Sequence, residues 1–312
     1  MVGTQMTAQV NKQLTNISQK IVPEGMIVEE ALPLLNVVQS SGIIAGYGNS
    51  HLRIVSSVTG GKNKVPQVDT KAYTQEVYQV QDHSLKDFVT KEDRVNVESP
   101  FDAEVDTMDE LNTQLFLEKN FAFANTVTDT GVITNNVTLS GTSQYSDYDN
   151  SDPLGDFATA RNSVFDNTGR VPDTVLMDRK TFNTLSTHPE MLRALGFADA
   201  RPGGILENEM ARAMQVERVL IDSSVYNAAK EGQADDVQAV FGRNIVFAVL
   251  PRSAARRQVS LGYRIQQFGT PRAVFRSDVD DPPETTRIIV RDTYELRFTN
   301  TDAGYLIKDT IA

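Results

Sequence analysis

The sequence predicts an α+β protein, and three patterns along its 312 residues indicate this class. A long amphipathic helix is expected between residue 99 and about residue 125. From residue 153 onward, short helical stretches alternate with short apolar strands, which is typical of one compact α+β domain. Near the C-terminus, apolar and polar residues alternate, so a strand with one buried face is expected there.

Residues 1–48 look like an arm rather than a domain. Pro23 and Gly25 interrupt a narrow helical stripe, and an isolated helix of this length is marginal in water. The stripe therefore needs a partner surface, which is either the chain's own core, the commoner case, or a neighbouring subunit. Its apolar residues recur at helical spacing: Met6, Val10, Leu14, Ile17 and Ile21.

Residues 49–97 are expected to form a long hairpin. Leu52, Ile54 and Val58 mark a first strand-like segment, and Val77, Tyr78 and Val80 mark a second. The polar loop between them is rich in turn-forming residues. Because so thin a hairpin cannot bury itself, it either lies on another subunit or stands in solvent with a flexible tip.

The longest helix is expected to open the next segment, residues 98–152. Ser99 is expected to cap it, Pro100 to occupy its first position and Asp102 to complete a capping box. Acidic residues crowd its N-terminal half, where they complement the helix dipole. One face is apolar, with Phe101, Val105, Met108, Leu111, Leu115 and Ala122. Residues 126–152 read as an irregular connection with short strands.

The segment 153–285 reads as the compact domain. A helix is expected from Pro153 to the stop at Gly169. A buried strand then leads to Asp178, a candidate helix cap, and Pro189 suits the first turn of the following helix. Further along, one more helix and three strands are expected, at 206–214, 218–222, 237–241 and 245–250.

Residues 286–312 read as a hairpin. Residues 288–298 alternate between apolar and polar side chains, and 300–304 supply a turn. Tyr305, Leu306 and Ile307 are then expected to return alongside the first strand.

Composition excludes several classes of protein. The chain has no cysteine, which rules out disulfides, thiolate metal sites and cysteine nucleophiles. Its formal net charge of −11 argues against a protein whose main task is to bind nucleic-acid backbones. No apolar run approaches the roughly 20 residues that cross a bilayer, and no secretory signal is evident, so a cytosolic protein is expected.

The sequence predicts no catalytic residue, no metal and no cofactor. His51, His83 and His188 stand in unrelated contexts. The segment 60–63 lacks the spacing of a phosphate-binding loop, and the acidic stretches 147–152 and 278–284 are expected to be solvated surface loops.

One segment and the order of elements carry a family resemblance. Gly169-Arg-Val-Pro-Asp173 before the buried strand and Thr187-His-Pro-Glu190 after the next helix resemble the A-domain of tailed-phage major capsid proteins of the Hong Kong 97 fold. The order of arm, hairpin and long acidic helix likewise resembles the N-arm, E-loop and P-domain of that family. The resemblance covers roughly residues 50–312.

The resemblance implies a Hong Kong 97-type capsid fold. Its parts would be an N-terminal arm (1–48), an extended E-loop hairpin (49–97), a spine helix in a discontinuous P-domain (98–152), an A-domain (153–285) and a C-terminal hairpin that returns to the P-domain (286–312). It implies a structural protein, not an enzyme, with arm and E-loop ordering only on assembly.

The implied function is that of a major capsid protein. Copies would form hexamers and pentamers of an icosahedral head that encloses the double-stranded DNA of a tailed phage, without sequence-specific binding and without a membrane. The protein would reside in the virion, and in the host cytoplasm during assembly. A separate scaffolding protein and a portal are expected partners, and a decoration protein is a further candidate.

Eight charged residues are expected at contacts between subunits. In cross-linked members of the family a lysine of the E-loop bonds to a neighbour's asparagine, but no motif here identifies that asparagine, so cross-linking is not predicted. The eight are Lys62, Lys64, Glu104, Asp106, Asp109, Arg252, Arg256 and Arg257.

Two other functions stay open at the level of sequence. An encapsulin, a bacterial compartment with the same fold, would co-purify with a cargo enzyme. A soluble carboxylate-dependent hydrolase, favoured only by abundant Asp and Glu, would be a monomer with a closed pocket.

Overall fold

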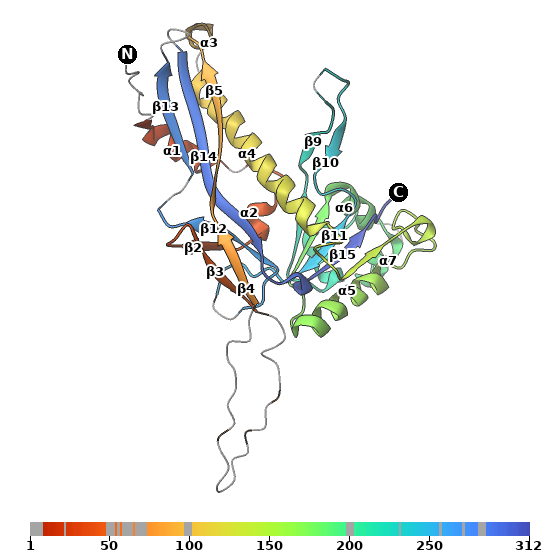
Figure 1. Cartoon of the computed structure of the whole chain (residues 1–312). Coiled ribbons are helices and arrows are strands. Elements are labelled where there is room, and N and C mark those ends of the chain that lie inside the picture. The colour runs from red at the N-terminus through yellow and green to blue at the C-terminus, as the bar shows by residue number, and fades with distance from the viewer. Residues whose placement is uncertain are drawn as a thin grey trace.

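The computed structural model shows two joined bodies, an elongated one and a compact one (Figure 1). The long helix α4 runs along the elongated body and ends against the compact one (Figure 1). The structure describes residues 9–21, 23–47, 54, 57, 65, 74–96, 102–197, 203–230, 232–255, 258–269, 272–279 and 285–312.

A six-stranded sheet forms the elongated body. Its centre is the long strand β14 (Thr285–Phe298), which pairs antiparallel with β13 (Ala273–Val279), β12 (Gly262–Gln267) and β5 (Gln81–Val89). The edge strands β1 (Gln9–Val10) and β2 (Leu34–Val37) come from the N-terminal segment. The segment 153–285 was expected to form the compact domain, but β12 and β13, which lie in that range, pair with β14 in the elongated sheet.

Helix α4 (Ala103–Val127) packs its apolar face on this sheet, as the sequence predicts. Its N-cap, however, is Asp102, whose carboxylate accepts a hydrogen bond from the Glu104 amide. The predicted cap at Ser99 therefore does not describe this helix; Ser99 and Pro100 lie outside the described residues. Both candidate caps carry a side-chain oxygen, so local sequence does not separate them.

The N-terminal segment packs on the chain's own body. Helix α1 (Lys12–Ser18) inserts Leu14 between α4 and β13, and helix α2 (Val28–Ala31) is buried against the compact body. For the described residues of the arm, the structure gives a packing partner within the same chain, and ordering on assembly stays a prediction. Partnership with the chain's own core, the commoner of the two cases, is confirmed for Leu14.

The hairpin begins earlier than expected. Its first strand, β3 (Ser41–Gly46), lies within the range expected for the arm and pairs antiparallel with β4 (Thr74–Gln79). Leu52 and Val58 lie outside the described residues, and Ile54 belongs to no strand. After β5, a short helix α3 (Lys91–Asn96) leads toward α4.

The compact body surrounds a five-stranded sheet in the order β6-β15-β11-β7-β8. These strands are β6 (Asn136–Thr138), β15 (Gly304–Lys308), β11 (Ile245–Ala248), β7 (Thr174–Asp178) and β8 (Arg218–Asp222). The sheet packs against helices α5 (Pro153–Thr168), α6 (Arg179–Ser186), α7 (Pro189–Ala194) and α8 (Glu207–Met214). Short 3-10 turns at Gly141–Ser143 and Thr301–Ala303 complete it.

Most local predictions for this body are confirmed. Asp178 caps α6, Pro189 occupies the first turn of α7, and Gly169 ends α5 with the left-handed φ of 67° that favours glycine. These signals act within one helical turn, so the sequence alone is enough to predict them.

The predicted C-terminal hairpin is wrong. Strand β15 does not return alongside β14; the chain leaves the elongated sheet, and β15 pairs with β11 and β6 inside the compact sheet. Every residue from Gly304 to Ile307 is buried, as a strand covered on both faces requires.

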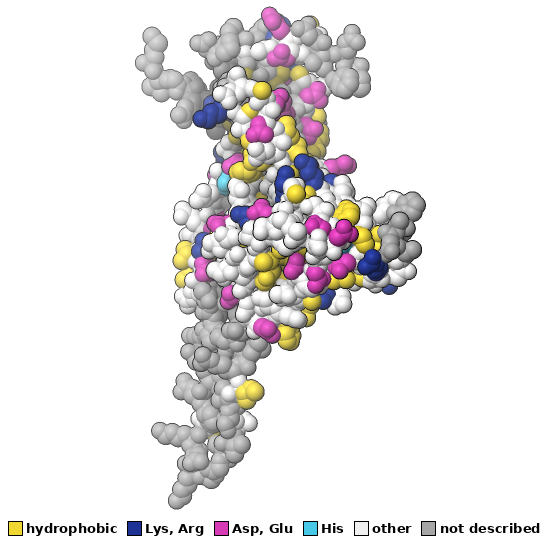
Figure 2. All heavy atoms as spheres, turned by 90° about the vertical axis from the view of Figure 1, so that its right-hand side faces the viewer, with side chains coloured by type: hydrophobic (Ala, Val, Ile, Leu, Met, Phe, Trp, Pro, Cys, Tyr) yellow, Lys and Arg dark blue, Asp and Glu magenta, His cyan; other side chains and the backbone are white. Residues whose placement is uncertain are grey.

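A two-stranded ribbon, β9 (Val225–Asn227) and β10 (Val237–Ala239), projects from the compact body beside α4 (Figure 1). Figure 2 shows acidic and basic side chains spread over the side of the molecule turned to the viewer. Among the helices that the structure describes, none is long and apolar enough to cross a membrane.

Candidate assembly surface

A buried ion cluster joins the N-terminal segment, α4 and the elongated sheet. The Lys119 ammonium group lies 2.5 Å from the Asp292 carboxylate of β14 and 3.2 Å from the Glu29 carboxylate of α2. Glu29 also pairs with Arg264 of β12. The Lys119 side chain is 2% exposed, so its charge depends on these two carboxylates for solvation. The cluster holds α2 between the two bodies.

One turn of α4 also carries a polar junction to the compact body. Asn120 donates hydrogen bonds to Asp222 (2.9 Å) and Ser224 (2.8 Å), and its side-chain oxygen accepts from the Val28 amide (3.2 Å). Asp222 is fully buried, and burial raises its pKa although these hydrogen bonds oppose the change. Asn120 thus connects α2, α4 and the compact sheet.

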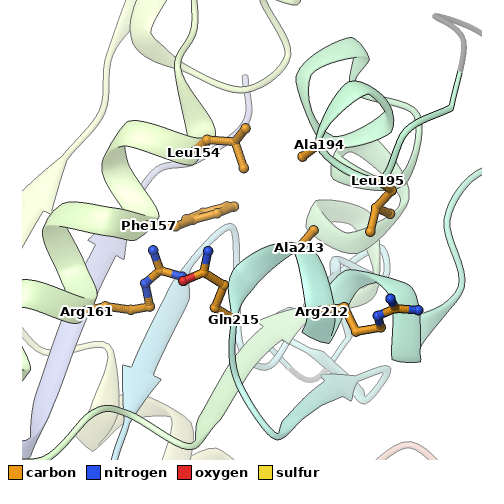
Figure 3. A pocket seen from close by; sticks show the side chains of 8 residues that line it. All are labelled: Leu154, Phe157, Arg161, Ala194, Leu195, Arg212, Ala213 and Gln215. Carbon is orange, nitrogen blue, oxygen red and sulfur yellow. The ribbon is translucent and has the colours of Figure 1, made fainter.

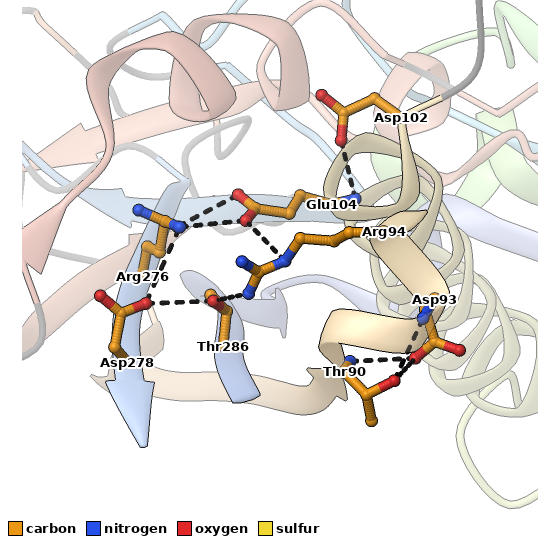
Figure 4. A network of polar contacts seen from close by, with 8 residues as sticks. All are labelled: Thr90, Asp93, Arg94, Asp102, Glu104, Arg276, Asp278 and Thr286. Carbon is orange, nitrogen blue, oxygen red and sulfur yellow. Dashed lines mark hydrogen bonds and ion pairs between the residues drawn. The ribbon is translucent and has the colours of Figure 1, made fainter. Parts of the chain in front are cut away.

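Glu104 lies in a third network, at the N-terminal end of α4 (Figure 4). Its carboxylate lies 3.1 Å from Arg276 of β13 and 3.6 Å from Arg94 of α3. Arg94 also donates to Thr286, whose hydroxyl donates to Asp278. Glu104 was predicted to contact another subunit, and the structure engages it with two arginines of its own chain.

The other predicted contact residues are not brought together. Asp106 and Asp109 are exposed on α4, one and two turns beyond its cap, and neither forms an ion pair with a described residue. Arg252 is exposed in the loop after β11. The remaining four predicted contacts lie outside the described residues: Lys62, Lys64, Arg256 and Arg257.

His188 has a structural role at the start of α7. It caps α7: its Nδ1 atom accepts from the Glu190 amide at 3.2 Å, and its Nε2 atom lies 3.0 Å from the Ser151 hydroxyl. Burial, and secondarily the charge of Arg193, lower the pKa of His188. The neutral ring is the form that can accept at Nδ1.

The acidic loop before α5 forms hydrogen bonds within itself. The Asp147 carboxylate accepts hydrogen bonds from the Asn150 side chain and from the amides of Asp149 and Asn150, and these bonds lower the pKa of Asp147. Among the described residues, no cluster of three or more acidic or histidine side chains could hold a metal ion.

A cavity of about 410 Å³ lies between α5, α7 and α8 (Figure 3). Arg161 stands at its edge and donates to the Met214 carbonyl oxygen at 2.9 Å. No carboxylate, imidazole or hydroxyl of a described residue lines the cavity, so these residues offer neither a base nor a nucleophile for hydrolysis. Its lining residues are Leu154, Phe157, Arg161, Ala194, Leu195, Arg212, Ala213 and Gln215.

The buried polar junctions of α4 were not predicted from the sequence. Lys119 follows Leu115 by four residues, which places it on the apolar face of α4, and Asn112 and Asn120 share that buried face. A lysine and two asparagines on a predicted apolar stripe indicate buried polar contacts, because such residues are rarely buried without partners. Their partners, Glu29, Asp222 and Asp292, are too distant in sequence to be inferred.

The chain is similar in sequence to a known phage protein. No family model matches the chain. It is 23% identical over 304 residues to the major capsid protein of Burkholderia phage BcepMu, and the match covers 96% of this chain and 95% of that protein.

Solved structures share the fold. A phage-related protein from Bordetella bronchiseptica RB50 superposes with a TM-score of 0.76 and 20% identity, over 97% of this chain and 98% of that one. The capsid of cyanophage P-SCSP1u superposes with a TM-score of 0.59 and 10% identity, over 93% and 89% of the two chains.

Spine helix, elongated sheet and compact domain together define the Hong Kong 97 capsid fold, a class of shell-forming structural proteins. Within this class, the chain is a major capsid protein of a tailed phage and belongs to the virion. Its function is structural, not enzymatic.

Proposed function

We propose that copies of this chain form the hexamers and pentamers that close the icosahedral head around phage DNA. The observation that carries the proposal is the match to a phage major capsid protein over nearly the whole length of both chains. An encapsulin-type compartment would share the fold, but that sequence match favours the phage head. With a net charge of −11, the shell would not bind its DNA tightly.

The parts of the chain would take different roles in the shell. The compact body (the A-domain) would surround the fivefold and sixfold axes, while the elongated body (the P-domain) and the E-loop would contact neighbouring copies. A scaffolding protein, a portal and a decoration protein would be further partners. Arg252, with Arg256 and Arg257, would form salt bridges between copies.

Charge complementarity supports one specific contact. Residues 49–73 carry four basic side chains (Arg53, Lys62, Lys64, Lys71) and one acidic side chain (Asp69), although the chain as a whole is strongly acidic. The exposed carboxylates of Asp106 and Asp109 offer the opposite charge on α4. The basic loop of one copy would lie on the acidic end of the spine helix of the next.

Electron microscopy of the purified chain tests the assembly. Rings of five or six copies, or closed shells, are the expected result, and a chain that stays monomeric at high concentration with an intact fold would contradict the proposal.

A charge exchange tests the contact. Reversing two charges (Asp106→Lys with Asp109→Lys, or Lys62→Glu with Lys64→Glu) is expected to reduce assembly, and combining the two pairs is expected to restore it. Asp166→Lys with Glu217→Lys, which reverses two exposed charges elsewhere, is the matched control. Failure of the combined variant to recover would refute this pairing while leaving the shell function intact.

A further inference from the structure

A second cavity, of about 240 Å³, lies beside the buried ion cluster. Every described side chain that lines it carries a polar atom, and its wall joins α1, α2, α4 and the elongated sheet. Gln19 contributes to the wall from the end of α1, and Gln266 contributes from β12. A polar cavity of this size is large enough to hold a small polar ligand.

The wall of this cavity carries more positive than negative charge. Three cations (Lys119, Arg264, Arg272) stand against two carboxylates (Glu29, Asp292), which leaves one positive charge in excess. Lys119 pairs with both carboxylates, and Arg264 pairs with Glu29. Arg272 forms no ion pair with a described residue, so the excess charge belongs to Arg272.

Arg272 uses only part of its hydrogen-bonding capacity on the chain itself. Its side chain is 9% exposed and lies 4.2 Å from the centre of the Phe116 ring. Its Nη1 atom donates to the carbonyl oxygens of Ser18 at 3.0 Å and Ile21 at 3.3 Å. Its Nε and Nη2 atoms have no hydrogen-bond partner in the described part of the chain, and both remain accessible to a water-sized probe. Two N–H donors of a buried cation are therefore open to a ligand.

The charge of Arg272 is only partly compensated. The two carbonyl groups lie at the end of α1, and a helix end supplies at most about half an elementary charge. Burial above all, and secondarily the charge of Arg264, lower the pKa of Arg272, while the carboxylates of Asp292 and Glu29 oppose this change. A buried cation of this kind is stabilised by any anion that reaches it.

The groups on the wall suit an oxyanion. Two guanidinium groups, those of Arg264 and Arg272, line the cavity, and a guanidinium group binds an oxyanion through two parallel N–H donors. The side-chain amides of Gln19 and Gln266 are further donors on the wall. Arg272 lies too deep for the backbone of a DNA strand to reach it, so a free ion is expected.

We propose that this cavity binds one small oxyanion, such as inorganic phosphate, with Arg272 as its main partner. The bound ion would fasten the N-terminal segment to the elongated body, because Gln19 and the two carbonyl acceptors of Arg272 belong to the end of α1 and Glu29 belongs to α2. The proposal goes beyond the shell function and does not depend on it.

Titration calorimetry of the unassembled chain with inorganic phosphate tests the site, and sodium chloride at the same ionic strength is the reference. One phosphate ion per chain is expected to bind. Hydrogen exchange then tests the effect on the N-terminal segment. At a phosphate concentration of about ten times Kd, exchange of the α1 and α2 amides is expected to slow about tenfold, because the ion binds only the closed segment. Exchange of β7, in the compact body, is expected to stay the same.

Gln266→Glu supplies the missing negative charge from the chain itself. The variant keeps all three cations and places a carboxylate on the cavity wall, so it is expected to lose phosphate binding and to show slow exchange of α1 without phosphate. Gln233→Glu, the same change at an exposed glutamine between β9 and β10, is the matched control and is expected to bind phosphate normally. If Gln266→Glu does not fold, Gln19→Glu, at the exposed rim of the cavity, is expected to show the same loss of binding.

Four results would overturn the proposal. The first is the absence of phosphate binding to the unsubstituted chain, and the second is equal slowing of exchange by chloride, which would be general screening. The third is phosphate binding that persists in Gln266→Glu or is lost in Gln233→Glu, because the ion would then lie elsewhere. The fourth is displacement of phosphate by a short single-stranded oligonucleotide, which would assign the site to DNA. These measurements do not involve assembly, so the shell function stands whichever result is found.

Discussion

The ammonium group of Lys119 lies 2.5 Å from the carboxylate of Asp292, and both side chains are buried between the spine helix and the central strand of the elongated sheet. The same ammonium group stands 4.2 Å from the centre of the Tyr294 ring. A lysine so placed is stabilised by charge and by the face of an aromatic ring, and it cannot recruit water instead.

Replacing Lys119 by methionine is expected to destabilise the chain by roughly 3–5 kcal/mol, because it leaves the buried Asp292 carboxylate without its ion-pair partner and takes one of two cations from Glu29. Chemical denaturation of the unassembled chain measures the loss. Lys180→Met, at an exposed lysine of α6, is the control and is expected to change stability by less than about 0.5 kcal/mol.

Neutralising the buried partner provides the decisive comparison. Lys119→Met combined with Asp292→Asn is expected to recover part of the lost stability, since the unpaired buried carboxylate is removed and Glu29 keeps its pair with Arg264. If the double variant were less stable than the single one, the cost would come from packing rather than from charge.

Acid is expected to weaken the compact body through His188. The folded pKa of this histidine is lowered, so the native state binds fewer protons than the unfolded chain once the pH falls below the unfolded value of about 6.5. The contribution of His188 to the free energy of unfolding is complete above about pH 6.5 and declines as the pH falls toward the folded pKa. Protonation would also place an N–H on Nδ1, facing the Glu190 amide that now donates to it.

His188→Asn isolates this contribution, because asparagine can accept the same amide hydrogen bond without titrating. Stability is measured from about pH 7.5 to about pH 5 for both proteins, a range that spans the unfolded value. Nearby acids with raised pKa, Glu190 and Asp156, titrate in both, so the difference between the curves reports the histidine. Parallel curves for the two proteins would show that His188 does not control the acid response.

Features of the fold that have a local cause could be predicted from the sequence. Asp178 and Pro189 each act on the adjacent helical turn, and Gly169 supplies a conformation that other residues rarely adopt. Their roles could be predicted without knowing any distant contact.

Features that depend on a partner far away in the sequence could not be predicted. The residues of β15 could join either sheet, and only the tertiary structure places them beside β11. Strand β15 is buried from Gly304 to Ile307, whereas burial alternates along β14. The unbroken apolar run Tyr305-Leu-Ile307 is the sequence feature that indicated a strand covered on both faces. Lys119 and Asn120 could have been noticed on the apolar stripe, but their partners could not.

Gly46→Val is expected to lift the β3–β4 ribbon from its own sheet. A side chain there would overlap the Thr299 carbonyl oxygen, which belongs to backbone and cannot move aside. We expect a loss of about 1–3 kcal/mol, as for other overpacked sites. Hydrogen exchange of the β3 and β4 amides measures the detachment, and assembly should fail with it.

The control is Gly131→Ala, where an added Cβ atom would meet only the flexible Asp129 side chain. It is expected to leave both exchange and assembly unchanged. Normal exchange in Gly46→Val would mean that the ribbon does not depend on this close approach.

Asn120→Leu is expected to loosen the junction between the spine helix and the compact body. The substitution removes one donor to the buried Asp222 carboxylate and the acceptor of the Val28 amide, and each unsatisfied group costs about 1–3 kcal/mol. The pKa of Asp222 is already raised by burial and should rise further without its donor. A buried carboxyl with a raised folded pKa destabilises the fold less once it is protonated. The loss of folding free energy in Asn120→Leu should therefore be larger at about pH 7 than at about pH 5.

Denaturation at the two pH values, with hydrogen exchange of α2 and β8, measures both effects. A deficit that does not depend on pH would attribute the loss to the Val28 amide alone and would show that Asn120 does not control the charge of Asp222.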